Sequence, residues 1–271
     1  QPFPGLEAGQ SETLSRTWTA DRPSGGCRLV ASASFEGKTT EPVILYLPGF
    51  ERLFFPHVAS DAQWETEVAM INTGDGDFSG VLRAYAGNGS AVGSLNVQLP
   101  TNGRKQLTVG TSFPSPQTIR YLVMEGASGG VCGYTKFFES GGYRGALPAS
   151  AVTAADDLPI CHIASDPQWW TGIGLVNTSD QDKTLTLRCS TGQTSPLSIP
   201  SRGQKAFLVK DLFGGTAQPG MASAVLEGAQ GLVGLELFGQ GWQLGGIRLS
   251  DRTATTLYFP HLHSDAVWWT G

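Results

Sequence analysis

The stretch "FPHVASDAQWETEVAMINTG", residues 55–74, decides how this chain is organised, because it recurs. It returns as "ICHIASDPQWWTGIGLVNTS" at 160–179 and starts again as "FPHLHSDAVWWTG" at 259–271. Each copy holds a His, an Asp and one or two Trp in the same order, and we call this segment the joint. The three aligned His residues are 105 and 99 positions apart, so the chain is built from repeats of about 100 residues.

The repeat spacing predicts how the chain divides into units. We expect whole units at 53–150 and 158–250, joined by a linker at 151–157. Residues 1–52 resemble the back half of a unit, and residues 251–271 resemble the start of a further one.

Within a unit, the pattern is that of short strands. Segments with partial apolar–polar alternation, rich in β-branched and aromatic residues, are separated by Gly, Asn, Asp and Pro clusters. A propeller blade needs only about 40–50 residues, fewer than this repeat has. We therefore predict an all-β chain of tandem immunoglobulin-like β-sandwich domains with partial units at both ends.

Composition excludes several classes of partner. Charged residues make up only 15% of the chain, the net charge is −5 and no basic run occurs, so we expect no nucleic-acid partner. No apolar stretch reaches the roughly 20 residues of a membrane span. The low charge and the high Gly, Ser and Thr content favour an exported protein, extracellular or at the cell surface.

The joint itself could be a site or a structural device. On an extended strand, His57 and Asp61 would lie about 13 Å apart, and two ligands are fewer than a metal site needs. We interpret the joint as structural: Asp caps a turn, His bonds to neighbouring backbone, and Trp anchors the core or the contact between units. The residues concerned are His57, Asp61, Trp64, His162, Asp166, Trp169, Trp170 and Asp265. With no catalytic motif elsewhere, we expect no enzyme, no metal and no cofactor.

Cysteine usage allows a disulfide. Cys161 stands where the first joint has Pro56, and Cys189 stands where the first unit has Ala84. Four cysteines permit three pairings, of which we favour Cys161 with Cys189, as a staple within the second unit. The alternative is two free buried thiols.

The segment "SDPQWWTGIGLVNTSDQDKTLTL" resembles a tandem immunoglobulin-like repeat of bacterial secreted and surface proteins, with a W-W-T-G-I-x-L-x-N core. The resemblance is most specific at Trp169, Trp170, Thr171, Gly172 and Asn177. The first unit departs from it, with Glu65 and Glu67 in place of Trp170 and Gly172. The resemblance implies an extracellular β-sandwich repeat and supplies no catalytic residue.

Partial units at both ends suggest assembly. The start of a unit at 251–271 of one copy could complete the partial unit at 1–52 of the next copy by strand addition. Repeated from copy to copy, this gives a head-to-tail filament or surface layer. The interface predicted for this homopolymer consists of Trp18, Phe35, Phe259, His261, Trp268 and Trp269. Two alternatives are a piece of a longer repeat protein, in which neighbouring repeats are the partners, and closure within one chain.

A second class of function is carbohydrate binding by an adhesive module of a larger secreted protein. Trp242 lies in the glycine-flanked segment "GQGWQLGG", and Tyr143 lies near the equivalent place in the first unit. Exposed aromatic rings at these positions could stack on sugars of a polysaccharide. The alternative is that each ring covers its own hairpin.

Overall fold

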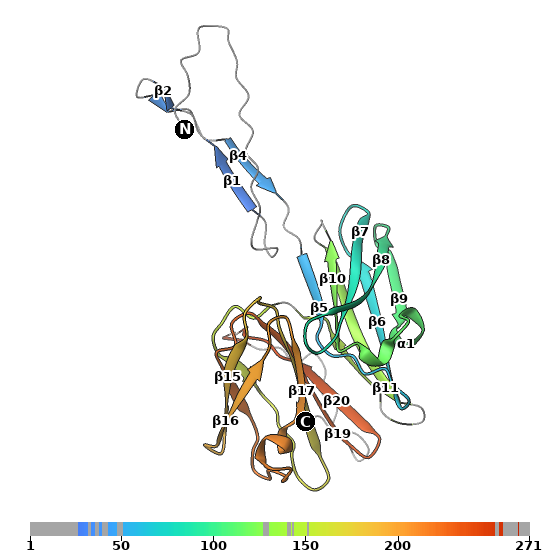
Figure 1. Ribbon diagram of the computed structural model, residues 1–271, viewed down its shortest axis with the longest axis vertical. Helices are drawn as coiled ribbons and strands as arrows, with labels where there is room; N and C mark the ends of the chain where they lie inside the picture. Colours follow the sequence, from blue (N-terminus) through green and yellow to red (C-terminus); the bar gives the residue numbers. More distant parts are fainter. Residues whose placement is uncertain are drawn as a thin grey trace.

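The computed structural model describes residues 51–126, 130–139, 144–150 and 152–252, residues 142, 255, 256 and 265, and the backbone of four short strands between 27 and 47. The described chain is all-β, with a few short helical turns. Most of it forms two layered bodies side by side, which we call unit 1 (β5 to β12) and unit 2 (β13 to β20) (Figure 1). Among the described residues, no helix has the length and hydropathy that a membrane crossing requires.

The strands before unit 1 form two small antiparallel pairs. β1 (Cys27–Ala31) pairs with β4 (Val43–Leu47), and β2 (Ser34–Phe35) pairs with β3 (Lys38–Thr39).

Unit 1 contains two antiparallel sheets of four strands, in the orders β5-β10-β7-β8 and β12-β11-β6-β9. Its strands are β5 (Glu51–Phe55), β6 (Trp64–Asn72), β7 (Phe78–Tyr85), β8 (Ala91–Leu99), β9 (Arg104–Thr108), β10 (Tyr121–Gly126), β11 (Val131–Glu139) and β12 (Arg144–Pro148). A helical turn, α1 (Val109–Ser112), and a 3-10 turn, η1 (Pro116–Thr118), lead from β9 to β10.

Unit 2 repeats this arrangement strand for strand, with sheets in the orders β13-β18-β15-β16 and β20-β19-β14-β17. Its strands are β13 (Leu158–Ile160), β14 (Trp170–Asn177), β15 (Lys183–Cys189), β16 (Thr194–Ile199), β17 (Gln204–Leu208), β18 (Ala224–Glu227), β19 (Leu232–Gln240) and β20 (Gln243–Arg248). The 3-10 turn η2 (Val209–Phe213) follows β17 as α1 follows β9.

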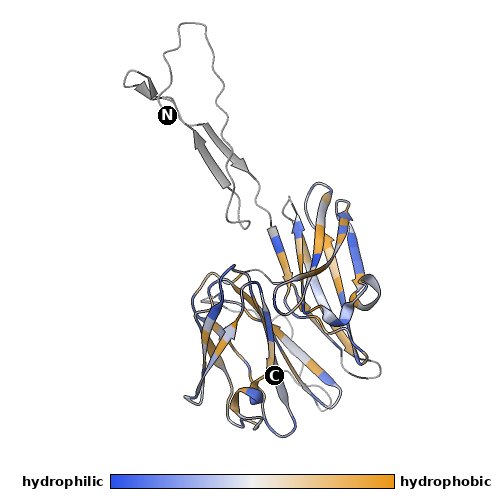
Figure 2. Ribbon diagram, viewed as in Figure 1, coloured by the Kyte–Doolittle hydropathy of each residue, from blue (hydrophilic) through white to orange (hydrophobic). Residues whose placement is uncertain are grey.

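Each unit encloses its own apolar core between its two sheets. On β16, buried Leu197 and Ile199 alternate with exposed Pro196 and Ser198, as expected for a strand with one face covered. Figure 2 shows apolar residues interleaved with polar ones along the strands. Burying a Leu or Ile side chain stabilises the fold by about 1.5–3 kcal/mol.

A buried asparagine closes the same corner of each unit. Asn72, at the end of β6, donates through its side-chain amide to the carbonyls of Gly76 and Leu99 at 2.8 and 3.1 Å. Asn177, at the end of β14, donates in the same way to Gln181 and Pro200 at 2.7 and 3.1 Å. Both side chains are almost fully buried, so each one links its strand end to two loops inside the unit.

The predicted disulfide between Cys161 and Cys189 is wrong, since both thiols are free in the structure. Ile160, next to Cys161, pairs with Ala224 on β18, and Cys189 pairs with the same Ala224 from the other side. One strand therefore separates the two cysteines. Two strand spacings are about 9.6 Å, beyond the roughly 7 Å that a disulfide spans between Cα atoms.

Candidate functional site at the junction of the two units

The first joint is a self-braced loop between β5 and β6. The Asp61 carboxylate accepts hydrogen bonds from the backbone N–H groups of Gln63 and Trp64, both at 2.8 Å. The Thr66 hydroxyl donates to the Ala59 carbonyl at 2.7 Å and accepts from the Ala59 N–H at 2.9 Å. Two side chains thus fix the loop at both of its ends.

The second joint has the same bracing. Asp166 accepts from the N–H groups of Gln168 and Trp169 at 2.8 and 2.7 Å, and Thr171 makes both bonds to Ala164 at 2.9 Å. The turn cap expected of the joint's Asp is present in both units. Thr171 stood out in the sequence without a predicted bracing role, although a Thr recurs at this place in every copy of the joint.

The joint's histidine has a different role in each unit. In unit 1, the side-chain amide of Gln204, on β17 of unit 2, donates to Nδ1 of His57 at 3.3 Å. The ring also lies 5.6 Å from the Phe137 ring, centroid to centroid. Desolvation at the junction, reinforced by the charge of Arg120, lowers the pKa of His57 to about 4. His57 is therefore neutral at pH 7, and its partner is a side chain of the other unit rather than the neighbouring backbone that we expected.

In unit 2, the histidine side chain remains 43% exposed. Nδ1 of His162 lies 3.1 Å from Oε1 of Glu236, and the ring lies 4.3 Å from the Phe238 ring. Burial raises the pKa of Glu236 to about 8 and lowers the pKa of His162. Both shifts disfavour the charged form of the group concerned, so burial favours a neutral carboxyl beside a neutral imidazole.

A carboxyl group and an imidazole with shifted pKa values are common in active sites. Oε2 of Glu236 is buried and has no hydrogen-bond partner among the described residues. Over the same residues, no group of three or more His, Cys, Asp or Glu side chains is arranged to hold a metal ion. The pair can bind or release one proton, but the described residues place no nucleophile in hydrogen-bond contact with it.

The two units are held together by an apolar contact between sheet faces. Phe54, Tyr121 and Val123, from the outer face of the β5-β10-β7-β8 sheet, pack against Val176 and Val233 on β14 and β19. All five side chains are buried. This contact takes aromatic surface out of water, which is the main source of stability in such interfaces.

Hydrogen bonds fix the register of the contact. The Tyr121 hydroxyl donates to the Arg202 carbonyl at 2.6 Å, and the Gln204 N–H donates to the Gly87 carbonyl at 2.8 Å. The connection between the units is also tied down, because Asp251 accepts from the N–H groups of Ala154 and Ala155 at 2.7 and 2.9 Å.

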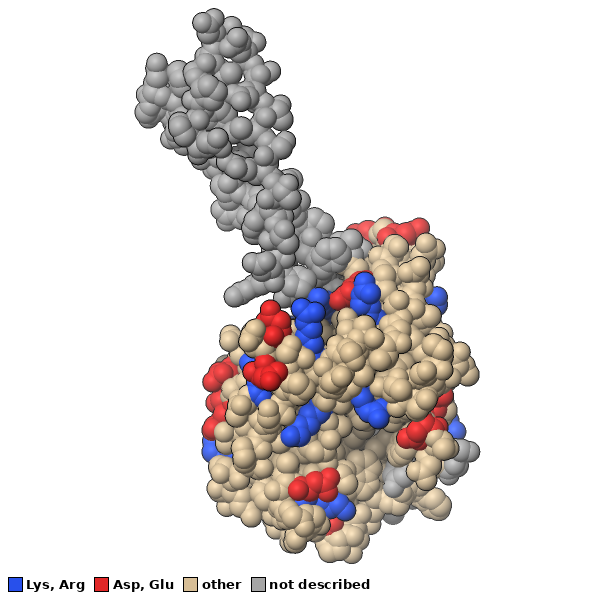
Figure 3. All heavy atoms as spheres, in the orientation of Figure 1, with Lys and Arg blue, Asp and Glu red and all other residues tan. Residues whose placement is uncertain are grey.

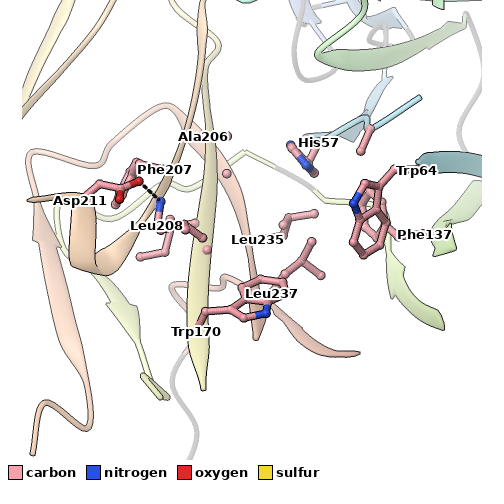
Figure 4. A pocket seen from close by; sticks show the side chains of 14 residues that line it. His57, Trp64, Phe137, Trp170, Ala206, Phe207, Leu208, Asp211, Leu235 and Leu237 are labelled. Atoms are coloured by element: carbon pink, nitrogen blue, oxygen red, sulfur yellow. Dashed lines mark hydrogen bonds between the residues drawn. The ribbon is translucent and has the colours of Figure 1, made fainter. Parts of the chain in front are cut away.

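Beside this contact the junction opens into a groove of about 520 Å³. Trp64 and Phe137 of unit 1 face Trp170, Leu235 and Leu237 of unit 2 across it (Figure 4). The groove also contains glycines at 172 and 174, and a Cβ added at 174 would lie 3.4 Å from the Cβ of His57. Small residues on β14 therefore make room for the first joint.

The faces that meet at the junction belong to different sheets, and residues of each are replaced in the other unit. Strand register gives the equivalents of the three aromatic residues on unit 1: Phe54, Tyr85 and Tyr121 correspond to Pro159, Ser190 and Ser223. Tyr85 and Tyr121 stack at 4.9 Å with an interplanar angle of 8°. Unit 2 thus lacks the aromatic anchors with which unit 1 docks.

The receiving face differs as much. Gly172, Leu235 and Leu237 of unit 2 correspond to Glu67, Tyr134 and Lys136 of unit 1. In unit 1 these residues interact with one another: Lys136 lies 3.8 Å from Glu67, and the Tyr134 hydroxyl donates to Glu67 at 3.5 Å. The groove wall of unit 2 is therefore replaced by polar residues in unit 1, whereas Val176 and Val233 correspond to Ile71 and Cys132.

The remaining predicted residues are scattered. Trp242 is 77% exposed at the tip of the β19–β20 hairpin, and Asp265 is exposed. Tyr143, Trp18, Phe259, His261, Trp268 and Trp269 lie outside the described residues, and Phe35 is described only as part of β2. Comparison with family models, with curated proteins and with solved structures finds no match to this chain.

Proposed function

We propose that this protein is a non-catalytic structural module of the cell exterior, in which two sandwich units are locked into one rigid building block. The observation that carries the proposal is the pairing of unlike faces: aromatic residues that unit 2 lacks meet an apolar groove wall whose residues Gly172, Leu235 and Leu237 are replaced by polar residues in unit 1. A flexible pair of domains has no need of matched faces, whereas a load-bearing or spacing element does.

The units are best regarded as relatives of the immunoglobulin fold. In each unit the second and fifth strands are neighbours in one sheet and the third and sixth in the other, as B–E and C–F are in immunoglobulin domains. The first, fourth and seventh strands lie in the other sheet relative to the ABED and CFG sheets of that fold. We propose an immunoglobulin-like core with altered edges.

Small-angle X-ray scattering tests the rigid block. We expect the full chain to scatter as a docked pair, with an unchanged radius of gyration between 50 and 500 mM salt, because the contact is apolar. Gly174→Glu would drive a charged side chain into His57 and should enlarge the radius of gyration. The control is Ser198→Glu, at an exposed position on β16 of the same unit, which should leave the pair docked. A wild-type curve typical of two freely moving domains would refute the proposal.

Assembly into a filament through Trp268 and Trp269 remains a prediction. Electron microscopy of the full chain beside Trp268→Ser/Trp269→Ser examines it. Filaments formed only by the unchanged chain would support head-to-tail assembly, and monomers in both preparations would leave a stand-alone block.

Carbohydrate binding is the second candidate, and the exposure of Trp242 favours it. A Trp side chain that is 77% exposed leaves an aromatic face in water, where it can stack on a sugar ring. The neighbouring hairpin approaches it, since a Cβ added at Gly142 would lie 3.8 Å from the Trp242 Cβ. Polysaccharide pull-down with Trp242→Ala, and with Val152→Ala as control, decides the matter: only the loss of Trp242 should abolish retention.

A further inference from the structure

We propose that the edge of unit 2 formed by His162 and Phe238 is the docking site for the third joint of the same chain. In this arrangement Trp269 and Gly271 take the positions that Trp170 and Gly172 hold against unit 1. The proposal deepens the structural role inferred above and rests on it, because it makes the junction between units 1 and 2 one of a series.

The edge that would be used is a copy of one that is already occupied. In unit 1, His57 lies beside Phe137, and both line the groove whose other wall includes Trp170 and Gly172 of unit 2. Strand pairing makes Phe238 the equivalent of Phe137, since they pair with Thr171 and Thr66, respectively. In unit 2, His162 lies against Phe238 in the same way, but its side chain keeps 43% of its surface exposed.

The third joint contains the same tetrapeptide as the segment of unit 2 that lines the groove against unit 1. Residues 169–172 read "WWTG", and residues 268–271 read "WWTG" again. The first joint has "WETE" at 64–67, and there both glutamates serve unit 1 itself. Glu65 accepts from the Gly110 N–H at 3.0 Å, and Glu67 pairs with Lys136. The tetrapeptide thus distinguishes unit 2, which sits on its predecessor, from unit 1.

The length of the connection suits docking within one chain. Trp170 follows Pro148, the last residue of β12, by 22 positions, and Trp269 follows Arg248, the last residue of β20, by 21. A tether of this length holds the segment at an effective concentration that a second molecule reaches only at about millimolar levels. The occupant to which we commit is therefore the third joint of the same chain.

The second docking differs from the first in strength. Unit 2 has Pro159, Ser190 and Ser223 in place of the aromatic anchors of unit 1, so the third joint would rest on the edge alone. On the face shown in Figure 3, charged side chains lie in small groups of both signs. We expect the second docking to open and close more readily than the first.

Nuclear magnetic resonance of the full chain tests the inference. Trp269→Glu/Gly271→Glu converts the third joint to the pattern of the first. It should speed amide exchange along residues 235–240 by at least tenfold and shift the ring signals of His162, while those of His57 stay in place. The matched control, Trp170→Glu/Gly172→Glu, should shift the ring signals of His57.

The outcomes separate this inference from the proposed function. If the third-joint variant leaves both His162 and the 235–240 amides unchanged, the docking site is refuted and the block of units 1 and 2 stands. If the control variant leaves His57 unchanged and the scattering curve compact, the structural role fails as well. A third outcome concerns dilution of the unchanged chain. If its His162 ring signals move to the positions seen in the third-joint variant on hundredfold dilution, the third joint docks on a second copy, and docking within one chain is refuted.

Discussion

Units 1 and 2 are alike where they fold and unlike where they meet. Both have eight strands in the same order, the same buried asparagine and the same Asp and Thr bracing of the joint. Their outer faces differ, however: unit 1 has Tyr121 at the position where unit 2 has Ser223. The comparison separates residues that specify a unit from residues that specify its neighbour.

We expect the largest loss of stability from a substitution in the faces that meet at the junction. Tyr121→Ala should destabilise the docked pair by about 3–4 kcal/mol, because it removes a buried aromatic ring and the hydrogen bond to Arg202. Ser223→Ala, its counterpart, should change stability by less than about 0.5 kcal/mol. Urea unfolding of both variants measures the difference, and equal losses would show that the two faces are not specialised.

A change in the shared framework should instead affect both units alike. Asn72→Ala and Asn177→Ala each remove several buried hydrogen bonds, and each should cost about 3 kcal/mol. Unfolding monitored by tryptophan fluorescence provides the two values. A large effect in one unit only would mean that the corner is not equally important in both.

Acid should weaken the junction before it weakens the units. The pKa of His57 is about 4 when docked, against the ordinary value of 6.5, so the docked state excludes the proton. The stability that neutral His57 gives the docked pair is fully present above pH 6.5. It falls by on the order of 2–3 kcal/mol as the pH drops toward 4. The difference in stability between the unchanged chain and His57→Gln, measured from pH 7 to pH 4, should shrink along this range. His162→Gln should retain the dependence of the unchanged chain.

The smallest effect is expected from the turn caps. Asp61→Ala and Asp166→Ala each leave two backbone N–H groups at the turn without their side-chain acceptor and should cost about 1 kcal/mol. The matched controls Gln63→Ala and Gln168→Ala, next to each cap, should be close to neutral. Thermal unfolding is sensitive enough for both pairs, and a loss well above that of Asn72→Ala would point to a second role for the carboxylate.

The all-β class and the cap made by Asp61 were predictable from the sequence, because each depends on local pattern. Strand alternation, turn residues and an Asp preceding free N–H groups act over a few residues. The strand-ending position of Asn177 is local in the same sense, although its carbonyl partners are not.

The junction was not predictable, because its contacts join distant parts of the chain. Gln204, which donates to His57, lies 147 positions further along. The disulfide prediction failed for the same reason: both cysteines were correctly assigned to one unit, but only the strand order shows that β18 runs between Cys161 and Cys189. Once the register is known, the replacement of Phe54 by Pro159 can be read directly from the sequence.

The burial of Asn177 also limits its chemistry. Residues 177–179, "NTS", have the pattern that oligosaccharide-transferring enzymes recognise, as have residues 88–90, "NGS". The Asn177 amide nitrogen is enclosed by three carbonyls, whereas Asn88 is exposed on a loop. A glycan could be attached to Asn88 on the finished protein, but at Asn177 it would have to arrive before the strands close, and it would then prevent them from closing.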